Sequence, residues 1–155
     1  MRYSASATVA LSPTFASGRG HLKDVCELVN TQKVHVNDRN ADGETALVLA
    51  TKSDKWDVVQ ELITHENVDF NVCGRFGYTV LMWATLKGKL EVVSTLLKHD
   101  TLDTNLKNIA GSTALDIANN CGHVAIAELL WDTKLICHGI DTIQHDASPA
   151  KRMKK

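Results

Sequence analysis

Residues 77–84 read Gly-Tyr-Thr-Val-Leu-Met-Trp-Ala, and the same pattern occurs twice more in the chain. Residues 43–50 read Gly-Glu-Thr-Ala-Leu-Val-Leu-Ala, and residues 111–118 read Gly-Ser-Thr-Ala-Leu-Asp-Ile-Ala. Successive copies are 34 residues apart. A fixed period of this size is typical of stacked supersecondary units that contact only their neighbours. The 155 residues are therefore expected to form one repeat domain and not a globule with a single centre.

The register continues beyond these eight residues. Apolar residues recur eight and twelve positions after each final alanine, and an asparagine closes each unit. These positions are Val58, Val92 and Ile126, then Leu62, Leu96 and Leu130, with closing asparagines at Asn37, Asn71 and Asn105. The apolar spacing predicts a second helix whose apolar stripe is buried only when units stack. A degenerate further copy occurs upstream, between Ala16 and Asn37.

The residues of one unit have identifiable physical roles. Thr45 is placed to cap a short first helix through its hydroxyl, which is worth about 1 kcal/mol. Leu47 and Ala50 are three residues apart and share one face of that helix, where the small alanine lets the second helix approach. Gly88 and Gly122 allow a tight turn between the two helices that a side chain would hinder.

This pattern resembles the ankyrin repeat, which reads roughly D-x-x-G-x-T-P-L-H-x-A, then G-H, and closes on D-x-N. The resemblance covers roughly residues 13 to 131. The family's proline is replaced by Ala46, Val80 and Ala114, and its histidine by Val48, Met82 and Asp116. The resemblance implies an all-α ankyrin-repeat solenoid of about four helix-turn-helix units with short β-hairpin-like loops and a C-terminal capping segment.

The expected organisation has three parts. Residues 1–12 form a flexible N-terminus, residues 13–145 the repeat domain, and residues 146–155 a basic tail. The units are expected at residues 13–37, 38–71, 72–105 and 106–131, followed by a cap over residues 132–145. We number these units first to fourth. A cap is expected because a terminal unit otherwise leaves its apolar face uncovered.

Composition limits the classes of partner. The net charge is −1, so a strong general attraction to nucleic acid or to membranes is not expected. No apolar run approaches the about 20 residues that span a bilayer. We therefore expect a monomer whose partner is a protein, with neither nucleic acid nor membrane as a ligand. A cytoplasmic location is expected, and the basic residues 151–155 leave nuclear import open.

The residues that could catalyse a reaction or bind a metal ion do not form a recognisable site. The cysteines and histidines lack the short paired spacings of zinc ligands. Cys121, His123, Cys137 and His138 are the one set that could be drawn together, but His123 is already explained by the Gly-His turn of the repeat. His65 and His99 are 34 residues apart and follow the second helix, which favours a solvated or helix-end role. We expect no metal, no cofactor and no enzymatic activity.

The candidate site is a surface. In ankyrin-like proteins the hairpin tips and first helices line a concave groove that binds partners. Carried over by position, the candidate partner-binding residues are Arg39, Asp42, Arg75, Phe76, Tyr78, Trp83, Leu86, Lys87, Lys107 and Ile109. The second unit also offers Glu44 and Lys52 there, so it presents charge, whereas the third presents aromatic residues.

The aromatic residues of the third unit predict where binding is strongest. Phe76, Tyr78 and Trp83 are three of the 8 aromatic residues in the chain. Aromatic and arginine side chains at the centre of an interface commonly carry most of the binding energy. The alternative is that these aromatic residues pack between neighbouring units. Trp56 and Trp131 align with apolar positions of the second helix and are expected in the core or at its edge.

The sequence thus predicts a non-catalytic protein–protein interaction module, acting as a small inhibitor or an adaptor. One alternative is an architectural or accessory unit whose groove has no ligand. The other is a protein that binds metal or catalyses a reaction through its cysteines and histidines. The resemblance also implies that Asn71 or Asn105 is a position to check for hydroxylation.

Overall fold

The computed structural model describes residues 35–137, with residues 134–137 described by their backbone alone. The helices are α4 (Ala46–Lys52), α5 (Trp56–Ile63), α6 (Val80–Leu86), α7 (Leu90–Leu96), α8 (Ala114–Cys121) and α9 (Val124–Cys137). The described residues contain no strand. The expected N-terminus, almost all of the first unit and the basic tail lie outside the described residues. Part of the expected cap lies within them, where it continues helix α9.

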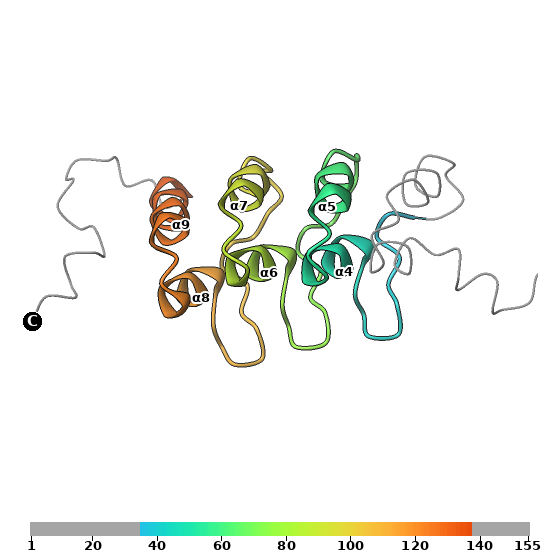
Figure 1. The fold of residues 1–155 in the computed structure, drawn as a ribbon, viewed down its shortest axis with the longest axis horizontal. Helices are drawn as coiled ribbons and strands as arrows, with labels where there is room; N and C mark the ends of the chain where they lie inside the picture. The colour runs from blue at the N-terminus through green and yellow to red at the C-terminus, as the bar shows by residue number, and fades with distance from the viewer. Residues whose placement is uncertain (1–34, 138–155) are drawn as a thin grey trace, which may run out of the picture.

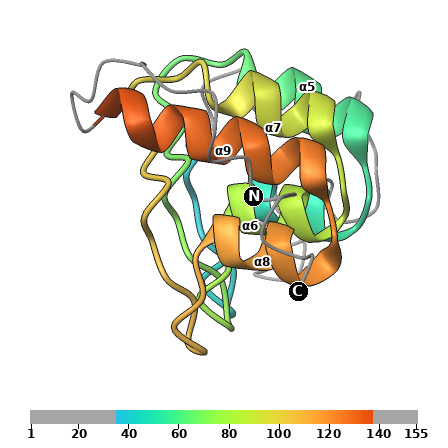
Figure 2. The same cartoon turned by 90° about the vertical axis from the view of Figure 1, so that its left-hand side faces the viewer.

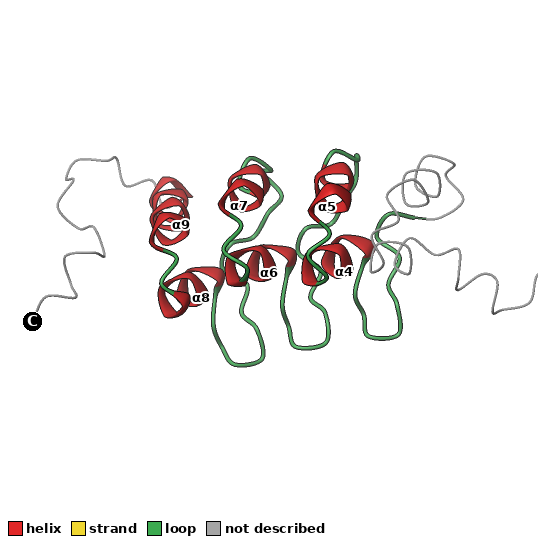
Figure 3. Ribbon diagram, viewed as in Figure 1, coloured by secondary structure: helices red, strands yellow, loops and turns green. Residues whose placement is uncertain are grey.

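The helices form two layers with the loops projecting from one side. The first helices α4, α6 and α8 pack on one another in sequence, and each packs against the second helix of its own unit. Helices α5, α7 and α9 form the other layer, as Figure 1 shows. The end-on view in Figure 2 shows the long loops running away from both layers, and Figure 3 shows these loops between helices. The expected all-α solenoid is confirmed.

The predicted threonine caps begin all three first helices. The hydroxyl oxygens of Thr45, Thr79 and Thr113 accept hydrogen bonds from backbone N–H groups three residues later, at 3.4, 3.3 and 3.3 Å. At the third of these caps, Asp116 accepts in return from the N–H of Thr113, which completes a capping box. The repeated threonine thus satisfies a donor that the helix itself leaves unpaired.

The tight turns between paired helices use left-handed backbone conformations. Gly88 and Gly122 have φ values of +67° and +73°, as expected from their place in the repeat. In the second unit Asp54 occupies this position with φ +59°. Close packing restricts Gly88 further, because an added Cβ would lie 2.8 Å from the ring of His123. The Gly-His turn therefore also packs the fourth unit against the third.

The core consists of the repeated apolar residues. Leu47 and Leu81 are buried, and Leu115 is half-buried against the core at the end of the described stack. The alanines at the ends of the repeated segments and the apolar faces of the second helices are also buried. These residues are Ala50, Ala84 and Ala118, with Val58, Leu62, Val92, Leu96, Ile126 and Leu130. For these repeated positions of the described units, the predicted core is therefore confirmed.

The two tryptophans on the second helices differ. Trp56 is half-buried and packs against the core, with the ammonium of Lys89 4.9 Å from its ring centroid. Trp131 was expected in the core or at its edge, but this prediction is wrong, because 41% of the residue is exposed. Its equivalents Ile63 and Leu97 pack against the core. Among the described residues no further unit follows α9, so the matching position in the fourth unit is left uncovered.

The closing asparagines join consecutive units. The amide of Asn37 donates to the backbone oxygen of Asn67 at 2.7 Å, and its oxygen accepts from the N–H of Asp69 at 2.8 Å. Asn71 makes the same two bonds one period later, at 2.7 and 2.8 Å. The repeated asparagine is thus a link between units as well as the end of one.

Candidate binding surface

Three hairpin loops, named the second, third and fourth loops after their units, lie over residues 38–45, 72–79 and 106–113 and carry most of the candidate residues. Each contains the same hydrogen-bonded turn. In the second loop the N–H of Asn40 donates to the oxygen of Glu44, and the N–H of Gly43 donates to the oxygen of Asn40, both at 3.0 Å. The other two loops repeat these bonds at 2.9 to 3.1 Å. The backbone of the tips is therefore held by internal bonds.

All the predicted partner-binding residues are at least partly accessible to solvent. The exposed ones are Arg39, Asp42, Arg75, Phe76, Lys107 and Ile109, and the half-buried ones are Tyr78, Trp83, Leu86 and Lys87. Most exposed members lie at the tips of the loops, and the half-buried ones lie nearer to or on helix α6. The structure thus groups them on the loops and the first-helix layer that the repeat register indicated.

The third and fourth loops touch through their backbones, and each carries a large exposed apolar side chain. Phe76 is 52% exposed and Ile109 is 78% exposed. The N–H of Ile109 donates to the oxygen of Phe76 at 3.3 Å. An added Cβ on Gly77 would lie only 2.9 Å from the nitrogen of Ile109. Glycine therefore lets the two loops approach, and their approach brings two exposed apolar residues together.

The other aromatic residues of the third unit contact each other. The ring centroids of Tyr78 and Trp83 are 4.9 Å apart, with the planes inclined by 39°. Both residues are half-buried, so each has one face against the protein and part of its surface in solvent. Their mutual contact lies within the third unit, so it is not the packing between neighbouring units that was the alternative. Phe76 differs from both because it is mainly exposed.

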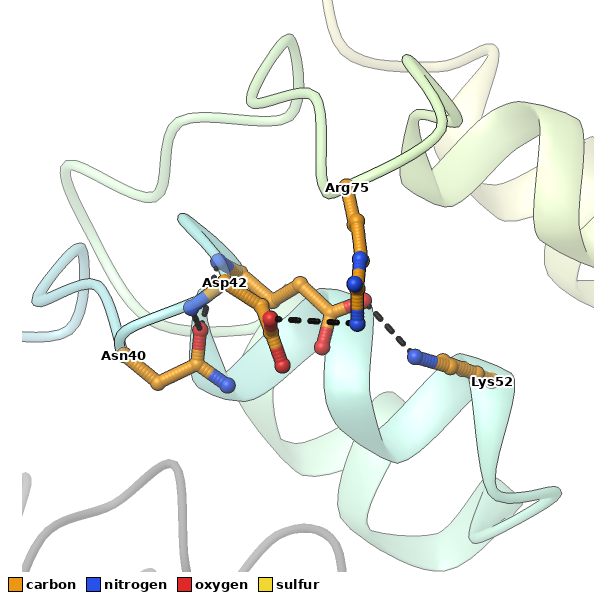
Figure 4. A network of polar contacts seen from close by, with 5 residues as sticks. Asn40, Asp42, Lys52 and Arg75 are labelled. Atoms are coloured by element: carbon orange, nitrogen blue, oxygen red, sulfur yellow. Dashed lines mark hydrogen bonds and ion pairs between the residues drawn. The ribbon is translucent and has the colours of Figure 1, made fainter.

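Glu44 does not belong to the exposed surface where the sequence analysis placed it. Only 2% of the residue is exposed, and its carboxylate oxygen Oε1 lies 2.9 Å from the Nζ of Lys52 (Figure 4). An added Cβ on Gly74 would lie 2.8 Å from the Cγ of Glu44. The side chain of Glu44 is therefore enclosed between the second and third loops. A buried charge needs a partner, which Lys52 supplies.

The sequence contains a signal for this burial that position-by-position reading missed. Asn40 and Asn108 occupy equivalent positions, and each accepts two backbone N–H bonds through its side-chain oxygen. The third unit has Gly74 at this position, so its loop lacks those bonds. An asparagine at position 74 would need the space that the side chain of Glu44, from the preceding unit, occupies.

Ion pairs connect the second unit to the third. Arg75 Nη1 lies 3.8 Å from Asp42 Oδ1 at the loop tips, and Lys87 Nζ lies 2.6 Å from Asp54 Oδ2 at the helix turns (Figure 4 shows the first pair). Within residues 35–133, Arg39 and Lys107 have no ion pair. Both are exposed cations at the outer loops of the surface.

Other chemistry is sparse over the described part of the chain. It contains no cluster of three histidine, cysteine or acidic residues able to hold a metal ion. Cys73 is half-buried and Cys121 is exposed, whereas the side chain of Cys137 and all of His138 lie outside the description. None of the described helices has the length and apolar character needed to cross a membrane. His99 is not simply solvated, because its ring stacks on Phe70 at 4.5 Å.

The stacked helical pairs, their threonine caps and their projecting loops define a helical repeat protein. The chain belongs to the ankyrin-repeat family. The family model described as "Ankyrin repeats (3 copies)" matches residues 14–108 and, in an overlapping second match, residues 55–146. A search of curated proteins found no significant match. Ankyrin repeats are generally protein–protein interaction modules, so the surface described above belongs to a protein-binding class of fold.

Proposed function

We propose that this protein is a non-catalytic binding module whose partner protein occupies the concave groove lined by the hairpin loops and first helices. The exposure of Phe76 carries the proposal, because a large aromatic side chain is held in solvent by a loop with internal backbone bonds. Exposed apolar groups on a fixed support are typical of interaction sites. Tyr78 and Trp83 extend the same surface toward helix α6.

In the cell, we propose that the module acts as a small inhibitor or an adaptor and works as a monomer. Its near-neutral net charge supports a protein ligand over nucleic acid. Cytoplasmic location, with nuclear entry through the basic residues 151–155, is part of the same proposal. Light scattering of the purified chain measures its mass in solution, and imaging of tagged chains with and without the tail measures its location.

The decisive experiment has two stages. Affinity capture from native extract followed by mass spectrometry identifies the partner, and calorimetry then measures its dissociation constant. Phe76→Ala should weaken binding by about 2 kcal/mol, which is roughly a 30-fold change. The melting temperature and helical circular dichroism should stay close to wild type, because the ring is mainly exposed.

Leu90→Ala is the matched control. Leu90 begins α7 in the other helix layer and is 42% exposed, so its truncation removes a comparable exposed apolar group. The control should bind the partner as wild type does. Loss of folding in Phe76→Ala would instead identify the ring as a packing residue. Equal capture by wild type and by a Phe76→Ala/Trp83→Ala variant would favour the architectural alternative.

A further inference from the structure

The third and fourth hairpin loops have a charge pattern that their apolar tips do not explain. Residues 72–79 and 106–113 contain two cations, Arg75 and Lys107, and no acidic residue. Arg75 lies 3.8 Å from Asp42 of the second loop, and both side chains are exposed. An exposed pair at this distance contributes little, so Arg75 can exchange this carboxylate for another. Lys107 has no ion pair among the described residues.

The backbone holds the apolar residues of these tips at fixed positions relative to the two basic residues. Phe76 follows Arg75 directly in the third loop, and Ile109 is two residues from Lys107 in the fourth. The bond from the N–H of Ile109 to the oxygen of Phe76 joins the two loops. A surface held in one geometry loses little conformational entropy when it binds. The two loops therefore offer a preorganised backbone on which exposed apolar residues and basic residues lie close together in the sequence.

We propose that these two loops bind an extended acidic segment of the partner protein, in which carboxylates flank one or two apolar side chains. This inference rests on the proposed function and specifies the chemistry of its ligand. The carboxylates pair with Arg75 and Lys107, and the guanidinium of Arg75 suits a carboxylate because its donors form a planar fork. The apolar side chains of the segment cover Phe76 and Ile109.

The same cations favour a peptide over a polyanion. Affinity for nucleic acid comes mainly from neutralising many phosphates, and proteins that bind it well make several such contacts. Two cations on these loops, in a chain of net charge −1, supply a small part of that. Binding to an anionic membrane likewise needs a cluster of basic residues. Two cations with two exposed apolar groups match a short acidic and apolar segment.

A random library of about 12-residue peptides displayed on phage, selected against the full chain, tests the inference. The most enriched peptide is then synthesised and its dissociation constant is measured by fluorescence anisotropy. Enriched peptides should have a net negative charge and at least one large apolar residue. The double variant Arg75→Glu/Lys107→Glu should weaken binding of the synthetic peptide about tenfold or more, because both cations become repulsive.

Lys89→Glu/Lys98→Glu is the matched control. It changes the net charge equally, but its exposed lysines flank α7 in the other helix layer. This control should change the dissociation constant less than about twofold if the effect is local. Raising the salt concentration should weaken the wild-type complex several-fold, since exposed charges are screened over about 10 Å at 0.1 M salt.

Several outcomes would overturn the inference. These are enriched peptides that are neutral or basic, no enrichment at all, or equal weakening by the control variant. Tighter binding of a thymidine oligonucleotide, or of phosphatidylcholine vesicles containing phosphatidylserine, would also overturn it. The proposed function is judged separately by partner capture and Phe76→Ala. A captured partner that binds through Phe76 but is insensitive to the charge reversal would preserve the function and reject the acidic segment.

Discussion

The junction between the second and third hairpin loops differs in chemistry from the junction between the third and fourth. Both join units built on the same repeated pattern. The second and third loops are connected by charged side chains, with Glu44 enclosed beside Gly74 and Arg75 near Asp42. The third and fourth loops approach until their backbones bond, and they carry apolar tips. At the first junction the missing side chain of Gly74 leaves room for the carboxylate of Glu44, whereas at the second the missing side chain of Gly77 lets the two backbones approach.

Several features of the helices behind these loops are shared between the two junctions. At both, the first helices on either side begin at a threonine cap and contain a buried alanine. The closing asparagine differs, because the side chain of Asn71 bonds to the third unit at the first junction, whereas that of Asn105 has no hydrogen bond within residues 35–133 at the second. The repeated residues therefore build the stack, and the residues that differ between units give each loop its own surface. We therefore expect the residues at the loop tips to determine which partner the protein binds.

The largest effect is expected where the second and third loops meet. Lys52→Met should cost about 2–3 kcal/mol of the free energy of unfolding, because it leaves the buried carboxylate of Glu44 without a partner. The partial exposure of Lys52 keeps the cost toward the low end. Urea unfolding followed by circular dichroism measures it. The double variant Glu44→Gln/Lys52→Met should recover part of the loss, because a neutral amide is cheaper to bury.

Gly77→Ala should break the other junction, at a cost of about 2 kcal/mol. About half of this comes from the left-handed backbone conformation, with φ +72°, and the rest from a Cβ that meets Ile109 at 2.9 Å. Gly111→Ala is the control, since its φ is +77° and nothing lies within 4 Å of the added atom. Its cost should be about 1 kcal/mol. Equal costs in the two unfolding curves would show that the loops do not approach this closely.

The asparagine links should distinguish the junctions closed by Asn37 and Asn71 from the junction between the third and fourth units, which Asn105 closes. Asn37→Ala and Asn71→Ala each remove two bonds to the next unit, and each should cost about 1 kcal/mol. Asn105→Ala should cost less, because the side chain of Asn105 has no hydrogen bond within residues 35–133. Chemical unfolding of the three variants checks the order. A cost at Asn105 equal to the other two would contradict the assignment.

The smallest effect on stability is expected at the tip of the second and third loops. Arg75→Ala should change the free energy of unfolding by less than about 0.5 kcal/mol, because its pair with Asp42 is long and exposed. The Arg75→Ala variant should nevertheless bind the selected acidic peptide several-fold more weakly than the wild-type protein does. A stability loss comparable to that of Lys52→Met would mean that the loop tips hold the stack together and are not free for a partner.

The sequence predicted the shared features well, because repetition supplies several independent instances of each. Leu81, Ala84 and Thr79 could be placed from their equivalents in the neighbouring units. The burial of Glu44 does not follow from its own position in the repeat, because it depends on Gly74 of the next unit, where the other two units have an asparagine. Trp131 was misplaced because the register treats every unit alike, whereas burial at this position requires a following unit. The exposure of Phe76 also depends on the fold, because an aromatic residue suits both a core and a binding site.

The central claim is that the partner binds through the tips of the third and fourth loops. A comparison of partner binding by two double variants tests it most directly. Phe76→Ala/Ile109→Ala truncates the apolar tips of the third and fourth loops. Leu90→Ala/Val124→Ala truncates residues that are 42% and 53% exposed at the starts of α7 and α9. Calorimetry with the captured partner should show a loss of about 30-fold or more for the first variant and less than about twofold for the second. Equal losses, or a greater loss for the second variant, would contradict binding through the loop tips.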